Sequence, residues 1–267
     1  MIRRAAVAGR FYEAKPNSLA REIEAYLIPG KPKEPAIAVI CPHAGYIYSG
    51  HVAGAVYSEI VVPNKVIILG PNHTGLGRPA AIMVEGTWQM PFGPVPIADD
   101  LARLILKESE VLEEDVQAHL YEHSLEVQIP FLQYLNPDIA IVPICLSSLS
   151  LHEIEDIGLA IERVIRVYKE PVLIVASTDM SHYVPHDIAK KKDMLAIERI
   201  LELDPIGLLE VVMQEKISMC GAIPTAATII AAKGLGARQG YLVRYATSGE
   251  VSGDFYQVVG YAGIIIR

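Results

Sequence analysis

The stretch AIAVICPHAGYIYSG, residues 36–50, joins a short apolar run to a turn that carries a thiol, an imidazole and two phenols. The apolar run, residues 36–40, is continuous, which is typical of a strand buried on both faces of a sheet. The turn that follows holds His43 between Pro42 and Gly45. A buried strand usually ends in plain turn residues, so these reactive side chains indicate a functional loop if other strands end in the same way.

Short apolar runs bounded by Pro, Gly, Asn or Asp recur along the chain, at residues 66–69, 139–144 and 172–176. Helical patterns lie between them, for example at residues 19–27 and 125–135. Ser150 begins a capping box that predicts a helix to about Tyr168. This alternation predicts an α/β fold with a mostly parallel central sheet that is flanked by helices.

Two regions depart from the alternation. Residues 80–85 and 95–97 flank a segment rich in Pro and Gly around Trp88, which predicts a hairpin with Trp88 in its loop. Residues 241–247 and 257–265 predict an antiparallel strand pair that closes the sheet at the C-terminal end.

The composition excludes several classes of function. The chain has 267 residues, of which 51% are hydrophobic, and no linker or repeat divides it, so we expect a single domain over residues 1–267. A net charge of −8 with scattered Lys and Arg argues against a nucleic-acid partner. No long apolar span or secretory signal is present, and three cysteines cannot all pair, which predicts a cytoplasmic protein without membrane contact.

Polar loops follow two more of the predicted strands. Residues 66–69 are followed by GPNHTG, which contains His73, and residues 172–176 by STDMSHY, which contains Asp179 and His182. The carboxyl ends of parallel strands share one edge of a sheet, and ligands bind in the crevice at that edge. We therefore expect these two loops to lie beside His43.

Two histidines on rigid strand ends predict a metal site with three protein ligands and open positions, and His43 and His73 are the best pair. A carboxylate as third ligand would indicate iron, whereas a thiolate would indicate copper or zinc. Cys220, in SMCGAIP, is the candidate thiolate, because a helix start just after it would lower its pKa. The alternative is a small buried residue, as we expect for Cys41 and Cys145.

A further cluster lies in the motif EHSLEVQ, residues 122–128. His123 and Glu126 are three positions apart and share a helical face, where they would line a pocket or support a ligand histidine. The alternative is an ordinary helix start, where acidic side chains are favoured by the helix dipole.

Six motifs in order resemble the Memo family, which is named after a human mediator of cell motility: PHAGYIYSG, GPNHTG, EHSLEVQIPF, STDMSHY, MCGAIPT and TSGEVSGDFYQVVGYAG. The resemblance extends from near residue 1 to the end of the chain. It implies a fold similar to that of class III extradiol dioxygenases, which are non-haem iron enzymes that open catechol rings.

The resemblance also implies roles for individual residues. The Memo metal ligands, two histidines and a cysteine, fall on His43, His73 and Cys220. The catalytic histidine of the dioxygenases falls on His182, with Asp179 beside it, and Tyr48 lies near the pocket. Since the thiol replaces the carboxylate ligand of the dioxygenases, the implied metal preference moves from iron toward copper, and ring cleavage is left open.

Two functions from different classes follow. The first is a copper- or iron-dependent redox enzyme in which O2 or substrate takes an open metal position and His182 moves protons. The second is a non-catalytic module that binds a phosphopeptide or a small aromatic or anionic ligand in the same pocket, with Tyr46 and Tyr48 stacking on it. A zinc hydrolase with Asp179 or Glu126 as base is a third, disfavoured by the absence of a hydrolase motif. The resemblance further implies a radical-SAM protein as a partner.

Overall fold

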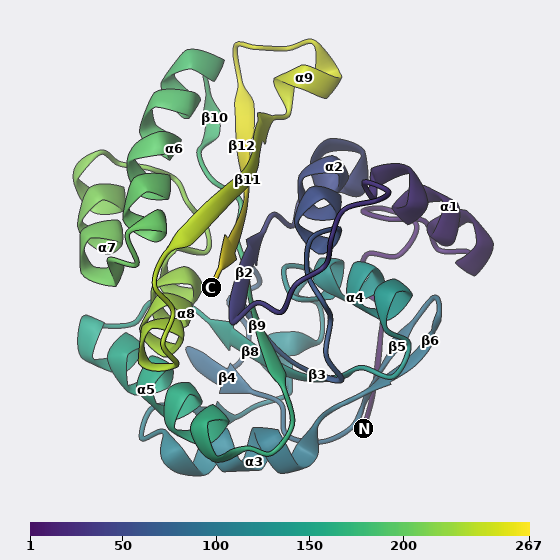
Figure 1. Ribbon diagram of the computed structural model, residues 1–267, viewed down its shortest axis with the longest axis vertical. Coiled ribbons are helices and arrows are strands. Elements are labelled where there is room, and N and C mark those ends of the chain that lie inside the picture. The colour runs from purple at the N-terminus through teal and green to yellow at the C-terminus, as the bar shows by residue number, and fades with distance from the viewer.

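The central sheet of the computed structural model, which describes residues 1–267, is built from the continuous apolar runs of the sequence (Figure 1). Its strands, in order across the sheet, are β10 (His182–Val184), β12 (Val258–Ile266), β2 (Ala38–Cys41), β9 (Val172–Ser177), β3 (Lys65–Pro71), β8 (Ala140–Leu146), β4 (Ala80–Ile82) and β7 (Glu113–Glu114). The four central strands, β2, β9, β3 and β8, run parallel, while most pairs outside them are antiparallel. The predicted α/β class is confirmed, with a mixed sheet around a parallel centre.

Helices cover both faces of this sheet (Figure 1). Their bounds are α1 (Pro16–Tyr26), α2 (Tyr46–Tyr57), α3 (Asp99–Glu108), α4 (Ile129–Leu135), α5 (Leu151–Val167), α6 (His186–Leu201), α7 (Pro205–Gln214), α8 (Ala222–Gly234) and α9 (Gly249–Ser252). On one face α8 packs on β2, β3 and β9, and α5 and α7 pack on α8; on the other face α2 packs on β2 and β12 beside α1 and α4. No helix is long and apolar enough to cross a membrane.

Local sequence accounts for how the helices begin and how closely they pack. The capping box at Ser150 forms as predicted, because its hydroxyl accepts from the amide of Glu153 and the Glu153 carboxylate accepts from the amide of Ser150. The absence of a side chain at Gly54 lets α2 approach α1, since a Cβ there would lie 2.4 Å from the carbonyl oxygen of Tyr26.

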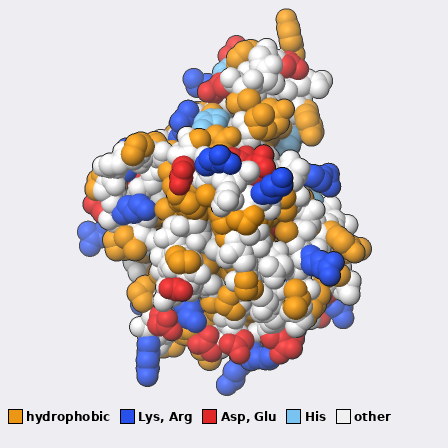
Figure 2. Space-filling view, turned by 90° about the vertical axis from the view of Figure 1, so that its right-hand side faces the viewer, with side chains coloured by type: hydrophobic (Ala, Val, Ile, Leu, Met, Phe, Trp, Pro, Cys, Tyr) orange, Lys and Arg blue, Asp and Glu red, His pale blue; other side chains and the backbone are white.

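The C-terminal pair forms as predicted: β11 (Gly240–Thr247) pairs antiparallel with β12. The ends of these two strands and α9 form a projection that carries exposed apolar side chains, among them Phe255 and Tyr256. Figure 2 shows this projection above the body of the molecule, with histidine side chains visible near its base.

The prediction for residues 80–97 is wrong in its pairing. β4 pairs antiparallel with β8, and the hairpin is formed by β5 (Thr87–Met90) and β6 (Gly93–Pro96), so Trp88 lies in a strand. β1 (Ile2–Arg4) pairs parallel with β5. Burial alternates along β5, which shows why the Pro- and Gly-rich flanks misled the sequence reading: a half-buried strand needs only alternate apolar residues.

The expected helix at residues 125–135 is shorter than predicted. A 3₁₀ turn, Glu126–Gln128, precedes α4, and the loop before it carries His123. Pro130 in the first turn of α4 accounts for this start, since proline has no amide hydrogen to offer a preceding helical turn. His123 and Glu126 therefore do not share a regular helical face.

The register of the parallel strands positions the functional loops. β9 lies between β2 and β3, with Cys41 opposite Ser177 and Leu69 opposite Ala176. The three strands thus end at nearly the same level of the sheet. The loops that follow them, which carry His43, His73 and Asp179, meet at one edge as predicted.

Candidate metal centre

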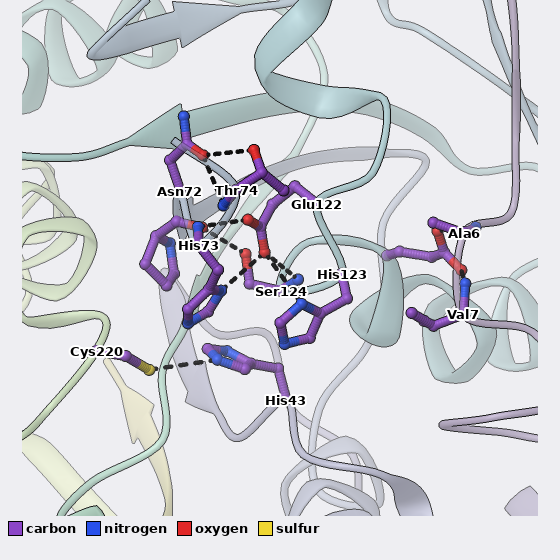
Figure 3. Close-up of polar contacts among 12 residues, drawn as sticks. Ala6, Val7, His43, Asn72, His73, Thr74, Glu122, His123, Ser124 and Cys220 are labelled. Carbon is purple, nitrogen blue, oxygen red and sulfur yellow. Dashed lines mark hydrogen bonds and ion pairs between the residues drawn. The ribbon is translucent and has the colours of Figure 1, made fainter. Parts of the chain in front are cut away.

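Three histidines meet at this edge: His43 after β2, His73 after β3 and His123 from the loop before α4 (Figure 3). Their candidate ligand atoms all lie within 4.8 Å of one another. The ring centroid of His43 lies 5.2 Å from that of His73 and 5.5 Å from that of His123. His43 is buried, His123 is half-buried and His73 is exposed, so the cluster opens to solvent on one side. This histidine cluster can hold a metal ion.

His43 directs one ring nitrogen, Nε2, at the centre. Its Nδ1 lies 3.0 Å from Oγ of Ser177. That hydroxyl gives its own hydrogen to the carbonyl of Ser124, so it accepts from the imidazole, which places the ring hydrogen on Nδ1 and a lone pair on Nε2. Burial, together with the nearby histidines, holds the pKa of His43 well below its usual range. A neutral imidazole is the form that binds a metal.

Glu122 also lies at this centre, although the sequence analysis did not single it out and it directly precedes His123 in the motif EHSLEVQ. Its carboxylate is fully buried and accepts from the His73 amide at 2.6 Å, from His73 Nδ1 at 2.9 Å and from the Ser124 amide at 2.8 Å. Burial acts to raise the pKa of Glu122, but the hydrogen bonds and charge of His73 and the Ser124 amide outweigh it and lower the pKa to about 2.

Cys220 faces the same centre from the loop before α8. Its Sγ lies 3.3 Å from Nε2 of His43 and 3.2 Å from the amide nitrogen of Asp179. It is not one of the three residues whose ligand atoms lie mutually within 4.8 Å. The expected lowering of its pKa does not occur: burial, and then the charge of Asp179, raise the pKa of the thiol to about 12. These effects outweigh the start of α8 at Ala222.

Asp179 and His182 do not form the expected pair. The carboxylate of Asp179 accepts from the amide of His43 at 2.8 Å, and burial raises its pKa to about 6. His182 Nδ1 instead lies 2.8 Å from the carbonyl oxygen of Ser218, and the His182 amide donates to the Ser218 hydroxyl at 2.7 Å. A carbonyl only accepts, so it fixes the hydrogen on Nδ1 and leaves the lone pair on Nε2 of His182.

Of three other residues expected at the pocket, two turn into the core and one stays partly exposed. Tyr46 is buried, and its hydroxyl donates to the carbonyl of Val127 at 2.7 Å, so it offers no stacking surface. Glu126 is fully buried in an ion pair with Arg3 at 2.6 Å and does not line a pocket. Tyr48 remains 38% exposed, because two positions along α2 turn its side chain away from that of Tyr46.

A sequence model described as "Memo-like protein" matches residues 3–265. The chain belongs to the Memo family. A MEMO1 family protein of Methanopyrus kandleri is 46% identical over 100% of this chain and 99% of that protein. A MEMO1 family protein of Methanothermobacter thermautotrophicus is 44% identical over 98% of this chain and 99% of that protein.

Among solved structures, the Memo chain is similar to the crystal structure of an uncharacterized protein from Escherichia coli K12, with a TM-score of 0.57. The similarity covers 84% of this chain and 98% of that chain, at 12% sequence identity. It therefore concerns the fold alone.

Proposed function

We propose that this Memo-family chain is a redox enzyme that uses copper or iron, held by His43, His73 and Cys220 with His123 as a fourth donor. The observation that carries the proposal is the cluster of three imidazoles at this edge of the sheet, with the Cys220 thiol 3.3 Å from Nε2 of His43. Imidazole with thiolate suits copper and zinc, and copper is bound more tightly than zinc by such donors. Iron is supported by the two strand-end histidines that iron sites also use.

The donor set fits a metal ion in its protonation as well as in its geometry. His43 is buried and neutral, so it binds without first losing a proton. Cys220 holds its proton in the metal-free protein and must release it on binding, which makes metal affinity rise with pH. The amide of Asp179 points at the sulfur and would stabilise the thiolate. When bound, copper or iron supplies one-electron chemistry and reactivity toward O2.

His182 is the proposed proton carrier. Its Nδ1 hydrogen is engaged by the Ser218 carbonyl, so Nε2 is free to take a proton from a substrate. The residue is half-buried, which allows the proton to pass on to solvent. It is close enough to His43 for its charge to lower the pKa of that imidazole, yet it is not among the clustered ligand atoms. Substrate would enter on the open side, where His73 is exposed.

The proposal is tested by anaerobic reconstitution with Cu⁺ or Fe²⁺, followed by metal analysis per chain and measurement of O2 consumption in the presence of an added electron donor. We expect about one metal per chain and O2 consumption that a chelator abolishes. Failure to retain either metal would contradict the proposal. Ligand binding that persists unchanged after chelation would support the alternative, a non-catalytic binding module.

A matched pair of variants tests the ligand assignment. Co²⁺ bound to a thiolate has a charge-transfer absorption, which we expect in the wild type and in His123→Ala but not in Cys220→Ser. Cys220→Ser should also weaken copper binding more than iron binding, because the soft thiolate is what favours copper. Wild-type copper affinity in Cys220→Ser would show that the thiol is not a ligand and that the three histidines bind the metal alone.

A further inference from the structure

We propose that Glu122 is a positioning residue that sets the tautomers of His73 and His123, so that both rings present Nε2 to the metal. The inference rests on the proposed metal site, but it makes a claim about the metal-free protein that can be tested separately. It assigns a role to a carboxylate that contacts no metal.

Several hydrogen-bond donors converge on the Glu122 carboxylate (Figure 3). Oε2 accepts from the His73 amide at 2.6 Å, and Oε1 accepts from the Ser124 amide at 2.8 Å. Oε1 also lies 2.9 Å from His73 Nδ1 and 3.4 Å from His123 Nδ1. The Glu122 side chain is 0% exposed, so the two amides and His73, and not bulk water, supply its hydrogen bonds.

An ionised carboxylate can only accept hydrogen bonds, so a ring nitrogen that contacts it must carry the hydrogen. In a neutral imidazole with its hydrogen on Nδ1, the lone pair is on Nε2. Glu122 therefore selects the Nδ1–H tautomer of His73 directly, and favours the same tautomer of His123 through the longer contact.

The rings of His73 and His123 are aligned with each other. His73 and His123 stack with centroids 4.7 Å apart and an interplanar angle of 23°, and their Nδ1 atoms face the same carboxylate. The Nε2 atoms of both rings are then directed away from Glu122. His43 stands across from both, with interplanar angles of 75° and 84°. One buried carboxylate thus orients two of the three imidazoles.

An amide at this position would conflict with the donors in either orientation. In Glu122→Gln, an NH2 group at the Oε2 position would oppose the His73 amide. An NH2 group at the Oε1 position would oppose the Ser124 amide and could pair with His73 only if Nδ1 became the acceptor. That switch moves the ring hydrogen to Nε2, where it blocks the metal. With the amide oxygen at the Oε1 position, by contrast, Nδ1–H of His73 can still donate to it, so Gln permits both tautomers where the carboxylate permits only one. The substitution therefore removes the selection of the His73 tautomer while hardly changing side-chain volume.

The test is long-range ¹H–¹⁵N correlation of the histidine rings in the metal-free protein, at about pH 8.5, where neutral imidazole predominates. We expect the Nδ1–H tautomer for His73 and His123 in the wild type and an additional Nε2–H signal for His73 in Glu122→Gln. The matched control is Glu126→Gln, an equally buried carboxylate in the same motif that contacts no histidine ring. It should leave both tautomers unchanged. Glu122→Asp, which keeps the charge, should retain the wild-type tautomer of His73 and supplies the comparison if Glu126→Gln does not fold.

The second readout is Zn²⁺ affinity, measured by competition with a chelator. Glu122→Gln should bind Zn²⁺ about 10–100-fold more weakly, the usual effect of removing a residue that supports a ligand histidine. Wild-type tautomers in Glu122→Gln would overturn the inference, whatever the affinity. If the wild type shows the expected tautomers but binds no Zn²⁺, copper or iron, the proposed function fails and the positioning role of Glu122 stands.

Discussion

Two polar clusters each take one buried glutamate from the motif EHSLEVQ, and they differ in how far their polar side chains are used in hydrogen bonds within the protein. The site cluster consists of His43, His73, Glu122, His123 and Cys220. The anchor cluster consists of Arg3, Tyr12, Trp88, His119 and Glu126. Glu122 and Glu126 lie four positions apart and are both 0% exposed, yet one contacts histidines and the other an arginine.

The anchor cluster uses its polar atoms internally. Arg3 donates to Glu126, to the carbonyl of Glu122 and to the carbonyl of His119, and its guanidinium lies 3.8 Å from the ring centroid of Trp88. Glu126 also accepts from the hydroxyl of Tyr12 at 2.7 Å. In the site cluster, by contrast, His43 and His73 use Nδ1 for hydrogen bonds to protein oxygens, while Nε2 of His43 faces the Cys220 thiol at 3.3 Å. Candidate ligand atoms that face one another distinguish a candidate binding site from a buried structural network.

The largest effect should come from removing a site histidine. We expect His43→Ala or His73→Ala to abolish tight binding of copper or iron, a loss beyond the about 10–100-fold that removal of a supporting residue causes. The exposed His152 provides the control, because His152→Ala should bind metal as the wild type does. Metal content per chain after reconstitution and gel filtration measures this, and tight binding by both site variants would place the metal elsewhere.

His182 tests the boundary of the site cluster. His182→Ala should retain metal but lower O2 consumption by about 10²–10⁴-fold, the usual contribution of a positioned acid or base. Metal content is the internal control in this experiment. Loss of metal together with activity would make His182 a ligand, and full activity would remove it from the mechanism.

Substitution of a residue in the anchor cluster should lower the free energy of unfolding. Arg3→Met leaves the carboxylate of Glu126 buried without its counter-charge, which should lower the free energy of unfolding by about 3–5 kcal/mol. Arg4 is the matched control, since it is the exposed neighbour on β1 and Arg4→Met should change stability by less than about 0.5 kcal/mol. Urea denaturation measures both variants. Equal effects would mean that the ion pair does not anchor the N-terminal strand.

His119 gives the anchor cluster a dependence on pH. Burial, and then the charge of Arg3, lower the pKa of His119 from its ordinary 6.5 to about 4. As pH falls, His119 is therefore protonated in the unfolded chain before it is protonated in the folded protein. Its contribution to stability is complete above pH 6.5 and is lost as pH falls toward 4. We expect the wild type to lose about 3 kcal/mol more than His119→Gln between pH 7 and pH 4. Parallel pH profiles of the two proteins in urea would contradict this.

Much of the site could be predicted because strand polarity is readable in sequence. A continuous apolar run followed by a polar turn indicates a buried parallel strand and its carboxyl end, and this placed His43, His73 and Asp179 at one edge. The residues whose surroundings were predicted wrongly are those for which the direction of the side chain decides what it contacts. Tyr46 and Glu126 turn into the core, and Glu122 turns toward the histidines, although the sequence around these polar residues gives no distinguishing pattern.

The sequence by itself determined the α/β class, the family and the strand ends on which two of the three clustered histidines lie, because these follow from local hydrophobic patterns and ordered motifs. Only the tertiary structure decided which groups meet each histidine. Glu122 reaches His73 across 49 positions of the chain, Cys220 reaches His43 across 177, and the Ser218 carbonyl takes the place expected for Asp179 beside His182. The physical reason is that tautomer and pKa depend on partners a few ångströms away in space, and spacing along a sequence does not record those partners.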